Sequence, residues 1–357
     1  MRQLVSVDLG YGYVKGVSST GKRILFPTMI AAGHERKLMT LFGGSNVDNM
    51  NNLHARIQGV DYFLGDLARE ARTYTRLFDR ERHNHPYTQI ILQAAVSLLV
   101  EEEVDSVVLV TGLPLDFYQS QASEFRRALQ GMNIDVQWVA GPLKGQSRKL
   151  TVEQVYVFPQ GAGAIFAALV DEGGKPIYPE LMAPGIQVGL IDIGHRTTDY
   201  VVVEMAPNGS MIPKSEWSGT IDEGILELYR QIRHAYKQQT GGADLSDHQV
   251  ERILHTGTIH FRGKRIVLQD QIQVSKNNLA SNLADRVKAA WGQASDFFDA
   301  IFICGGGGDL LFPSLQMYFD HRLHKMYDSQ FANAVGYLRL GAALVSHETV
   351  RNIAAAQ

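Results

Sequence analysis

Short runs of β-branched and aliphatic residues alternate along the chain with longer segments in which apolar residues recur at helical spacing. Glycine- and proline-containing turns separate the runs. The short runs predict strands: three within 3–30, then 104–115, 152–160, 187–194, 197–206 and 298–304. The periodic segments predict helices: 88–103, 121–131, 161–173, 220–239, 246–255, 276–291 and 333–346. Strands and helices mixed in this way indicate an α/β protein.

An internal repeat divides the chain into two halves. Residues 5–17 (VSVDLGYGYVKGV) and 189–201 (GLIDIGHRTTDYV) share the pattern apolar, Asp, apolar, Gly, then Lys or Asp seven residues after the first Asp. The corresponding pairs are Asp8 with Asp192, Gly10 with Gly194, and Lys15 with Asp199. One Asp-x-Gly alone would be an ordinary turn, but two in the same strand context predict two related lobes.

These two turns carry the candidate chemistry. A tight hairpin with glycine near its tip exposes backbone N–H groups that bind phosphate oxygens. An aspartate in such a turn repels phosphate unless a Mg²⁺ ion lies between them. Lys15 supplies a positive charge, and Thr197 and Thr198 supply hydroxyl donors. The alternative is that Asp8 and Asp192 only stabilise the turns.

Two common nucleotide-binding folds do not fit the sequence. The P-loop pattern G-x-x-x-x-G-K-[ST] is absent. The dinucleotide pattern G-x-G-x-x-G also does not occur between a strand and a helix, because Gly10-Tyr11-Gly12 leads into another strand.

Composition limits the remaining classes. The 357 residues are 45% hydrophobic with a net charge of −3, enough for about two domains and without a basic block for direct nucleic-acid binding. The single cysteine, Cys304, excludes an internal disulfide framework. We find no apolar run of about 18 residues, no secretory signal and no amphipathic anchor at either end. We therefore expect a cytoplasmic protein that does not bind a membrane.

Five segments, in order, resemble the motifs of the actin-like ATPase superfamily. Residues 8–15 (DLGYGYVK) resemble its first phosphate motif, 190–200 (LIDIGHRTTDY) its second, and 301–311 (IFICGGGGDLL) its adenosine motif. FPQGAGAIFA and NAVGYLRLGAAL resemble its two connecting helices. Within the superfamily, VLVTGLPLDFY is similar to the ParM-like plasmid-segregation actins and archaeal actin-like proteins.

The resemblance implies a duplicated, two-lobed, ribonuclease H-like fold. Lobe I would span 1–185, lobe II would span 186–332, and a C-terminal helix at 333–349 would pack back on lobe I. The expected function is ATP hydrolysis coupled to assembly of filaments that segregate plasmid DNA through a DNA-binding adaptor. The expected cofactors are ATP or ADP and Mg²⁺.

The resemblance also assigns roles to residues of this sequence. It implies that Asp8 and Asp192 hold the Mg²⁺–phosphate network and that Gln160 orients the attacking water. Gln160 could instead only cap the helix that follows it. The residues expected to contact the nucleotide are Gly10, Tyr11, Gly12, Lys15, Gly194, His195, Thr197, Thr198, Gly305, Gly306, Gly307 and Gly308.

The sequence departs from the family pattern at three positions. Tyr11 stands where actins have a small hydroxyl residue, and we expect its ring to point outward. His195 and Arg196 stand where many relatives have small residues, and the sequence leaves their role open. The adenine contacts are expected from helix 220–239, with four candidates that the sequence does not separate: Glu227, Arg230, Arg233 and Lys237.

Three other functions on the same fold fit the sequence less well. A small-molecule kinase needs a catalytic aspartate base, for which no third carboxylate motif is evident, and residues 31–60 look more like a polymer-contact loop than a sugar pocket. A chaperone needs a peptide-binding domain after the second connecting helix. A membrane-bound division protein needs an amphipathic terminus.

Overall fold

The computed structural model describes residues 1–33, 49–71, 73–76 and 85–356. Its contacts divide the chain into two compact units, Met1–Ile177 with Phe331–Gln357, and Tyr178–Gln330. The 34–48 part of the predicted polymer-contact segment lies outside the described residues.

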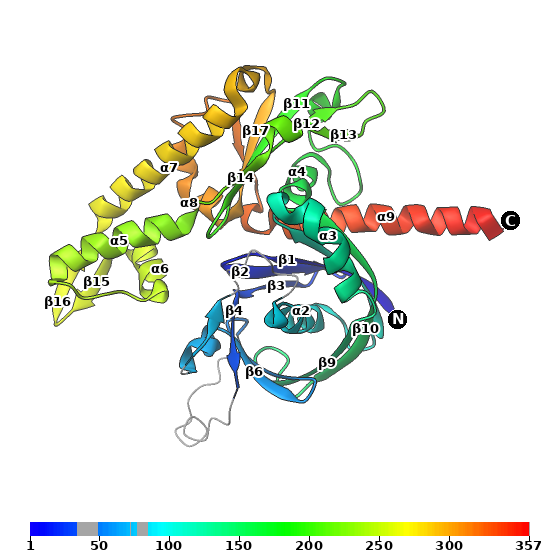
Figure 1. Cartoon of the computed structure of the whole chain (residues 1–357), viewed down its shortest axis with the longest axis horizontal. Coiled ribbons are helices and arrows are strands. Elements are labelled where there is room, and N and C mark those ends of the chain that lie inside the picture. Colours follow the sequence, from blue (N-terminus) through cyan, green and yellow to red (C-terminus); the bar gives the residue numbers. More distant parts are fainter. Residues whose placement is uncertain (34–48, 72, 77–84, 357) are drawn as a thin grey trace. The chain divides into compact units, whose positions relative to one another are not determined.

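A ten-stranded sheet forms the first unit, in the order β3-β2-β1-β8-β10-β9-β5-β6-β4-β7 (Figure 1). β1, β8 and β10 run parallel, whereas β2 returns antiparallel beside β1. The strands are β1 Arg2–Leu9, β2 Tyr13–Ser18, β3 Arg23–Pro27, β4 Met29–Ala32, β5 Asn52–Ile57, β6 Val60–Gly65, β7 Thr75–Arg76, β8 Ser106–Leu113, β9 Asn133–Ala140 and β10 Ser147–Pro159.

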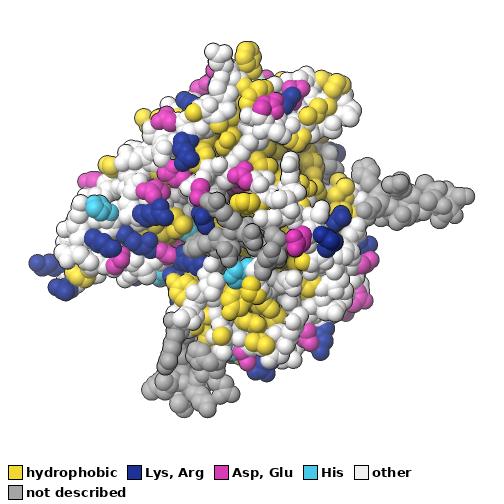
Figure 2. Space-filling view, in the orientation of Figure 1, with side chains coloured by type: hydrophobic (Ala, Val, Ile, Leu, Met, Phe, Trp, Pro, Cys, Tyr) yellow, Lys and Arg dark blue, Asp and Glu magenta, His cyan; other side chains and the backbone are white. Residues whose placement is uncertain are grey.

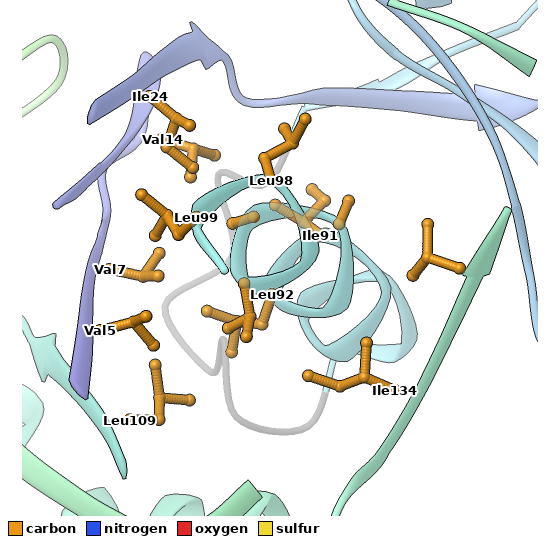
Figure 3. Packing of buried hydrophobic residues seen from close by; sticks show 14 of the residues in the cluster. Val5, Val7, Val14, Ile24, Ile91, Leu92, Leu98, Leu99, Leu109 and Ile134 are labelled. Atoms are coloured by element: carbon orange, nitrogen blue, oxygen red, sulfur yellow. The ribbon is translucent and has the colours of Figure 1, made fainter. Parts of the chain in front are cut away.

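The helices of this unit are α2 Pro86–Leu99, α3 Leu115–Leu129, α4 Ala162–Leu169 and α9 Ala332–Ala356. α2 is the centre of the apolar core because ten of its fourteen residues are buried. Figure 3 shows Leu92 and Leu99 of α2 facing Val5 and Val7 of β1, all of them fully buried. Burial of such side chains stabilises a fold by about 1.5–3 kcal/mol each, so these contacts fix β1 firmly against α2.

The second unit contains a six-stranded sheet and a separate two-stranded hairpin. The strands are β11 Gln187–Ile193, β12 Thr198–Met205, β13 Met211–Pro213, β14 Gly219–Ile221, β17 Ala300–Cys304 and β18 Leu323–Lys325, with β15 Thr258–Phe261 and β16 Lys264–Val267 in the hairpin. The helices are α5 Ile225–Thr240, α6 Asp247–Thr256, α7 Gln269–Trp291 and α8 Gly305–Leu315. β11 returns antiparallel as β12 and lies parallel to β17, which repeats the arrangement of β1 with β2 and β8.

Three predicted helix starts are wrong. The helix predicted at 276–291 begins seven residues earlier, at Gln269. The helix predicted at 220–239 begins only at Ile225, because Thr220 and Ile221 pair with β12 as part of β14. The helix predicted at 121–131 begins six residues earlier, directly after Pro114. Among the described residues, none of the helices is long and apolar enough to cross a membrane.

Candidate functional site

The first repeat forms the β1–β2 hairpin. Asp8 lies directly opposite Lys15 in the strand register. The Gly10 N–H donates to the Tyr13 carbonyl at 3.1 Å, which closes the hairpin around a two-residue tip. The Thr28 hydroxyl donates to the Gly10 carbonyl at 2.8 Å and fixes the tip from outside. A Cβ at Gly10 would lie 2.7 Å from the Tyr13 carbonyl oxygen, so the turn requires glycine.

Two donors hold Asp8, one from this hairpin and one from the residue that follows β10. Lys15 Nζ lies 3.0 Å from Asp8 Oδ2, and Gln160 Nε2 donates to Asp8 Oδ1 at 3.0 Å. Asp8 is only 2% exposed, so its charge depends on these partners rather than on water. The structure thus brings together three residues that the sequence predicted for the site, from segments more than 140 positions apart.

Gln160 follows β10 directly. Its backbone N–H donates to the Leu113 carbonyl at 2.7 Å, which extends the β10–β8 pairing to the last position before α4. The helix N-cap is Gly161, without a side-chain cap of its own. Gln160 therefore does not cap α4, and its side chain is directed to Asp8 instead.

The second repeat forms the β11–β12 hairpin with the same geometry. Asp192 lies opposite Asp199 in the register. The Gly194 N–H donates to the Thr197 carbonyl at 2.9 Å, again around a two-residue tip. The position that holds Lys15 in the first hairpin holds a carboxylate here, so Asp192 and Asp199 place two acidic side chains on one face of the second sheet.

Contacts within the second unit use several polar groups of this hairpin. The Thr198 side chain is fully buried and its hydroxyl donates to the Glu223 carbonyl at 2.8 Å, so a contact within the unit uses the donor that the sequence predicts for a ligand. The Thr220 hydroxyl donates to Asp199 at 2.5 Å. Thr197 contributes its carbonyl to the turn, and its side chain is partly exposed.

His195 and Arg196, the two tip residues whose role the sequence leaves open, have partners in the same unit. The His195 ring packs edge-on against Tyr229, with centroids 5.4 Å apart. Arg196 Nε lies 3.3 Å from Asp222 Oδ1. In the first tip, Tyr11 is only 7% exposed, so the expectation that it points outward is wrong, and Gly12 accepts a hydrogen bond from the Thr28 N–H.

The second tip also receives the beginning of α5. The N–H groups of Ile225 and Leu226 donate to the carbonyls of Gly194 and His195 at 3.2 and 2.8 Å. This contact requires Gly224, because a Cβ there would lie 2.7 Å from the Gly194 carbonyl oxygen. The helix that was expected to contact adenine therefore starts at the tip of the second hairpin.

The four glycines of 305–308 form the first turn of α8. Gly305 has φ +82°, and a Cβ there would lie 2.4 Å from Asp192 Oδ1. Gly307 packs against Ile193 and Ile225 just as closely, and Gly308 is buried. Only Gly306 among them is exposed, so it is the glycine at which a ligand can approach the backbone closely.

A surface pocket of about 520 Å³ lies between α5 and α7. Glu227 and Arg230 line it, and they form an ion pair with 3.1 Å between Arg230 Nη1 and Glu227 Oε2. The other two adenine candidates are engaged elsewhere, Arg233 with Asp247 and Lys237 with Asp244. Figure 2 shows basic side chains gathered over α5 and the β15–β16 hairpin.

Comparisons with known proteins match this architecture. Residues 6–163 match the family "Actin like proteins N terminal domain", and residues 190–317 match "Archaeal actin homologue MreB-like, C-terminal". An archaeal actin homologue of Thermoplasma acidophilum is 25% identical over 338 residues, which cover 94% of this chain and 97% of that protein.

Solved structures give the same result. The chain is similar to a ParM in a 15-stranded filament from Clostridium botulinum, with a TM-score of 0.84 and 28% identity over 96% of this chain and 99% of that one. It is also similar to a non-polymerisable quadruple mutant of pCBH ParM, with a TM-score of 0.81 and 27% identity over 96% of this chain and 100% of that one. The two hairpins, the fold around them and these matches show that the chain belongs to the actin-like ATPase superfamily.

Proposed function

We propose that the protein binds and hydrolyses ATP and that ATP drives its assembly into filaments. The observation that carries the ATPase proposal is the contact of Gln160 and Lys15 with the two oxygens of one buried carboxylate, Asp8. Phosphoryl transfer to water needs three groups: an ammonium that binds phosphate, a carboxylate that binds a metal-bound water, and an amide that orients the attacking water.

Gln160 would act through its carbonyl oxygen. Its Nε2 donates to Asp8 Oδ1, which fixes the amide plane and leaves Oε1 as the acceptor for a water proton. A neutral amide orients water but is a poor proton acceptor, so hydrolysis should be slow. Lys15 would leave Asp8 in part to contact a phosphate oxygen, to which it brings a full positive charge.

The base of the nucleotide would bind along α5. The helix begins at the second tip, where the phosphates are expected, and Glu227 and Arg230 lie about half a turn and one and a half turns further on, about 3–8 Å along the axis. Both line the pocket between α5 and α7. An archaeal actin homologue of the same fold, 22% identical, has been solved in complex with ADP, which supports a nucleotide as the ligand.

The residues fit magnesium bound as part of the nucleotide complex. Among the described residues, no three His, Cys, Asp or Glu side chains form a group that could hold a metal by themselves. Mg²⁺ commonly keeps several waters and uses one or two carboxylates plus phosphates, a role that would suit Asp8 in the first unit and, separately, Asp192 in the second. Such an ion would neutralise charge on the phosphates during their transfer.

Filament formation is proposed from the similarity to the ParM of the 15-stranded filament. We further propose that the filaments move plasmid DNA through a DNA-binding adaptor. The described β15–β16 tip exposes three cationic side chains, Arg262, Lys264 and Arg265. Together with Arg230 and Lys237 of α5, each of which is paired with a carboxylate, these cations number five, fewer than the roughly 6–10 phosphate contacts of proteins that bind DNA strongly through its backbone.

The alternative is a small-molecule kinase on the same fold. Assays of ATP turnover with and without sugars or other small alcohols separate the two functions. The filament proposal predicts that inorganic phosphate is released at the same rate in both cases. A phosphorylated alcohol, formed with accelerated ATP consumption, would favour the kinase and overturn the proposal.

A further inference from the structure

α4 has no side chains that could form hydrogen bonds with the free backbone groups at its own ends. Its eight residues, AGAIFAAL, carry no polar side chain, and the Gly161 N-cap contributes none. The first N–H groups and last C=O groups of a helix need partners from outside when the helix supplies none. In this fold one neighbour, α9, supplies a side-chain partner at each end, whereas the Phe166 and Leu169 carbonyls accept from the N–H groups of Val170 and Ile177.

Asn333 caps the beginning of α4. Its Oδ1 accepts hydrogen bonds from the Gly161 N–H at 3.0 Å and the Ala164 N–H at 3.2 Å. Asn333 is only 6% exposed, and it lies 172 positions after Gly161 in the sequence. The oxygen thus takes the role that a local Ser, Thr or Asp normally has in an N-cap.

Arg339 caps the other end of the same helix. Its Nη1 donates to the Ala167 carbonyl at 2.9 Å and to the Val170 carbonyl at 2.6 Å. Between the two caps the backbones nearly touch, since a Cβ at Gly336 would lie 1.7 Å from the Gly163 carbonyl oxygen. α4 and α9 therefore run side by side in the same direction, with a polar contact at each end.

The N-terminal cap lies next to the residue that contacts Asp8. Gly161 has φ +85°, in the region that only glycine adopts freely, so the chain between Gln160 and α4 is intrinsically flexible. The Leu113 carbonyl fixes the N–H of Gln160, and Asn333 fixes the N–H of the next residue. Two consecutive peptide groups are thereby held, and the direction of the Gln160 side chain with them.

We propose that Asn333 is a positioning residue for Gln160. It would hold the Gln160 amide on Asp8 without touching nucleotide itself. The effect on catalysis rests on the proposed ATPase function, whereas the effect on the Gln160 side chain does not.

The test compares two caps of one helix. Asn333→Ala removes the cap beside Gln160, and Arg339→Met removes the cap at the far end but keeps an unbranched apolar stem. We expect kcat for ATP hydrolysis to fall about tenfold or more in Asn333→Ala, because misplacement by about 1 Å can cost up to about 10²-fold. KM should stay within about twofold. Arg339→Met should retain wild-type kcat, and Asn333→Asp, which keeps the acceptor oxygen, should recover most of the activity.

A second measurement does not depend on ATPase activity. In nucleotide-free protein, Asn333→Ala should accelerate amide hydrogen exchange of Gly161 and move the Gln160 side-chain amide resonances, and Arg339→Met should do neither. If Asn333→Ala does not fold, Asn333→Gln moves the same amide by one methylene and should give both changes. Equal effects of the two cap variants, or an unchanged Gln160 signal, would overturn the positioning role. Absence of hydrolysis by the wild type would overturn the proposed function alone.

Discussion

Replacement of Gln160 by alanine separates hydrolysis from binding most sharply. The side chain is 8% exposed and makes one hydrogen bond to a carboxylate, so its loss should lower the free energy of unfolding by about 1.5–3 kcal/mol, the range for bonds to charged groups. Lys15 remains on the other oxygen of Asp8, so the carboxylate keeps its cation. The variant should therefore fold and still bind ATP.

Hydrolysis should respond much more strongly. Loss of a group that orients the attacking water costs about 10²-fold in rate, which corresponds to about 2.7 kcal/mol in the barrier. Phosphate release from Mg·ATP should fall by that factor, while the affinity for ATP stays near that of the wild type. Because hydrolysis is expected to trigger disassembly, filaments of Gln160→Ala should also persist longer.

Gln93→Ala is the matched control. Gln93 is 1% exposed and belongs to α2 of the same unit, so it tests the loss of a buried glutamine away from the hairpin tips. Single-turnover phosphate release and nucleotide affinity should be measured for both variants. Wild-type hydrolysis in Gln160→Ala, or an equal loss in Gln93→Ala, would refute the role of Gln160.

Asp192→Ala should reduce Mg²⁺-dependent hydrolysis far more than ATP affinity, because the proposed base contacts on α5 remain; equal turnover by variant and wild type would remove Asp192 from the mechanism. Hydrogen bonds and charge from Arg322 lower the pKa of Asp320 from its ordinary 3.8 to about 2, so the stability that this carboxylate contributes is fully present above about pH 4 and is lost as the pH falls through about 2. Asp320 is 48% exposed, and solvent screening therefore reduces this contribution to about 1 kcal/mol. Asp320→Asn should lower the unfolding free energy in urea by about that amount at pH 7, with a difference that shrinks toward pH 2; a constant difference would contradict this assignment.

The hairpin geometry could be predicted from the sequence because its causes are local. An aspartate seven residues before Lys15 or Asp199, with Gly10 or Gly194 between, fits a strand pair with a tight tip, and both pairs are opposite each other in the register. The apolar runs around them predict buried strands for the same reason.

The remaining features depend on contacts that are distant in sequence. Thr198 reads as a free hydroxyl, but its partner is the Glu223 carbonyl, 25 positions away. Residues 220–221 fit a helical period, yet their pairing with β12 places them in a strand. In the sequence, Asn333 is simply the first polar residue of its own helix, and only the packing of α9 on α4 shows that it caps a different helix, α4.

The central claim, that ATP drives assembly, is tested most directly by sedimentation. Subunit contacts of about −6 to −8 kcal/mol correspond to dissociation constants of roughly 1–50 μM, so protein at tens of micromolar is a suitable concentration. Samples with Mg·ATP, Mg·ADP and no nucleotide should be spun in parallel and the pellets viewed by electron microscopy. The account predicts filaments in the ATP pellet that disappear as ATP is consumed, and little pellet in the other two samples. Protein that stays in the supernatant under all three conditions, or that pellets equally in all of them, would contradict it.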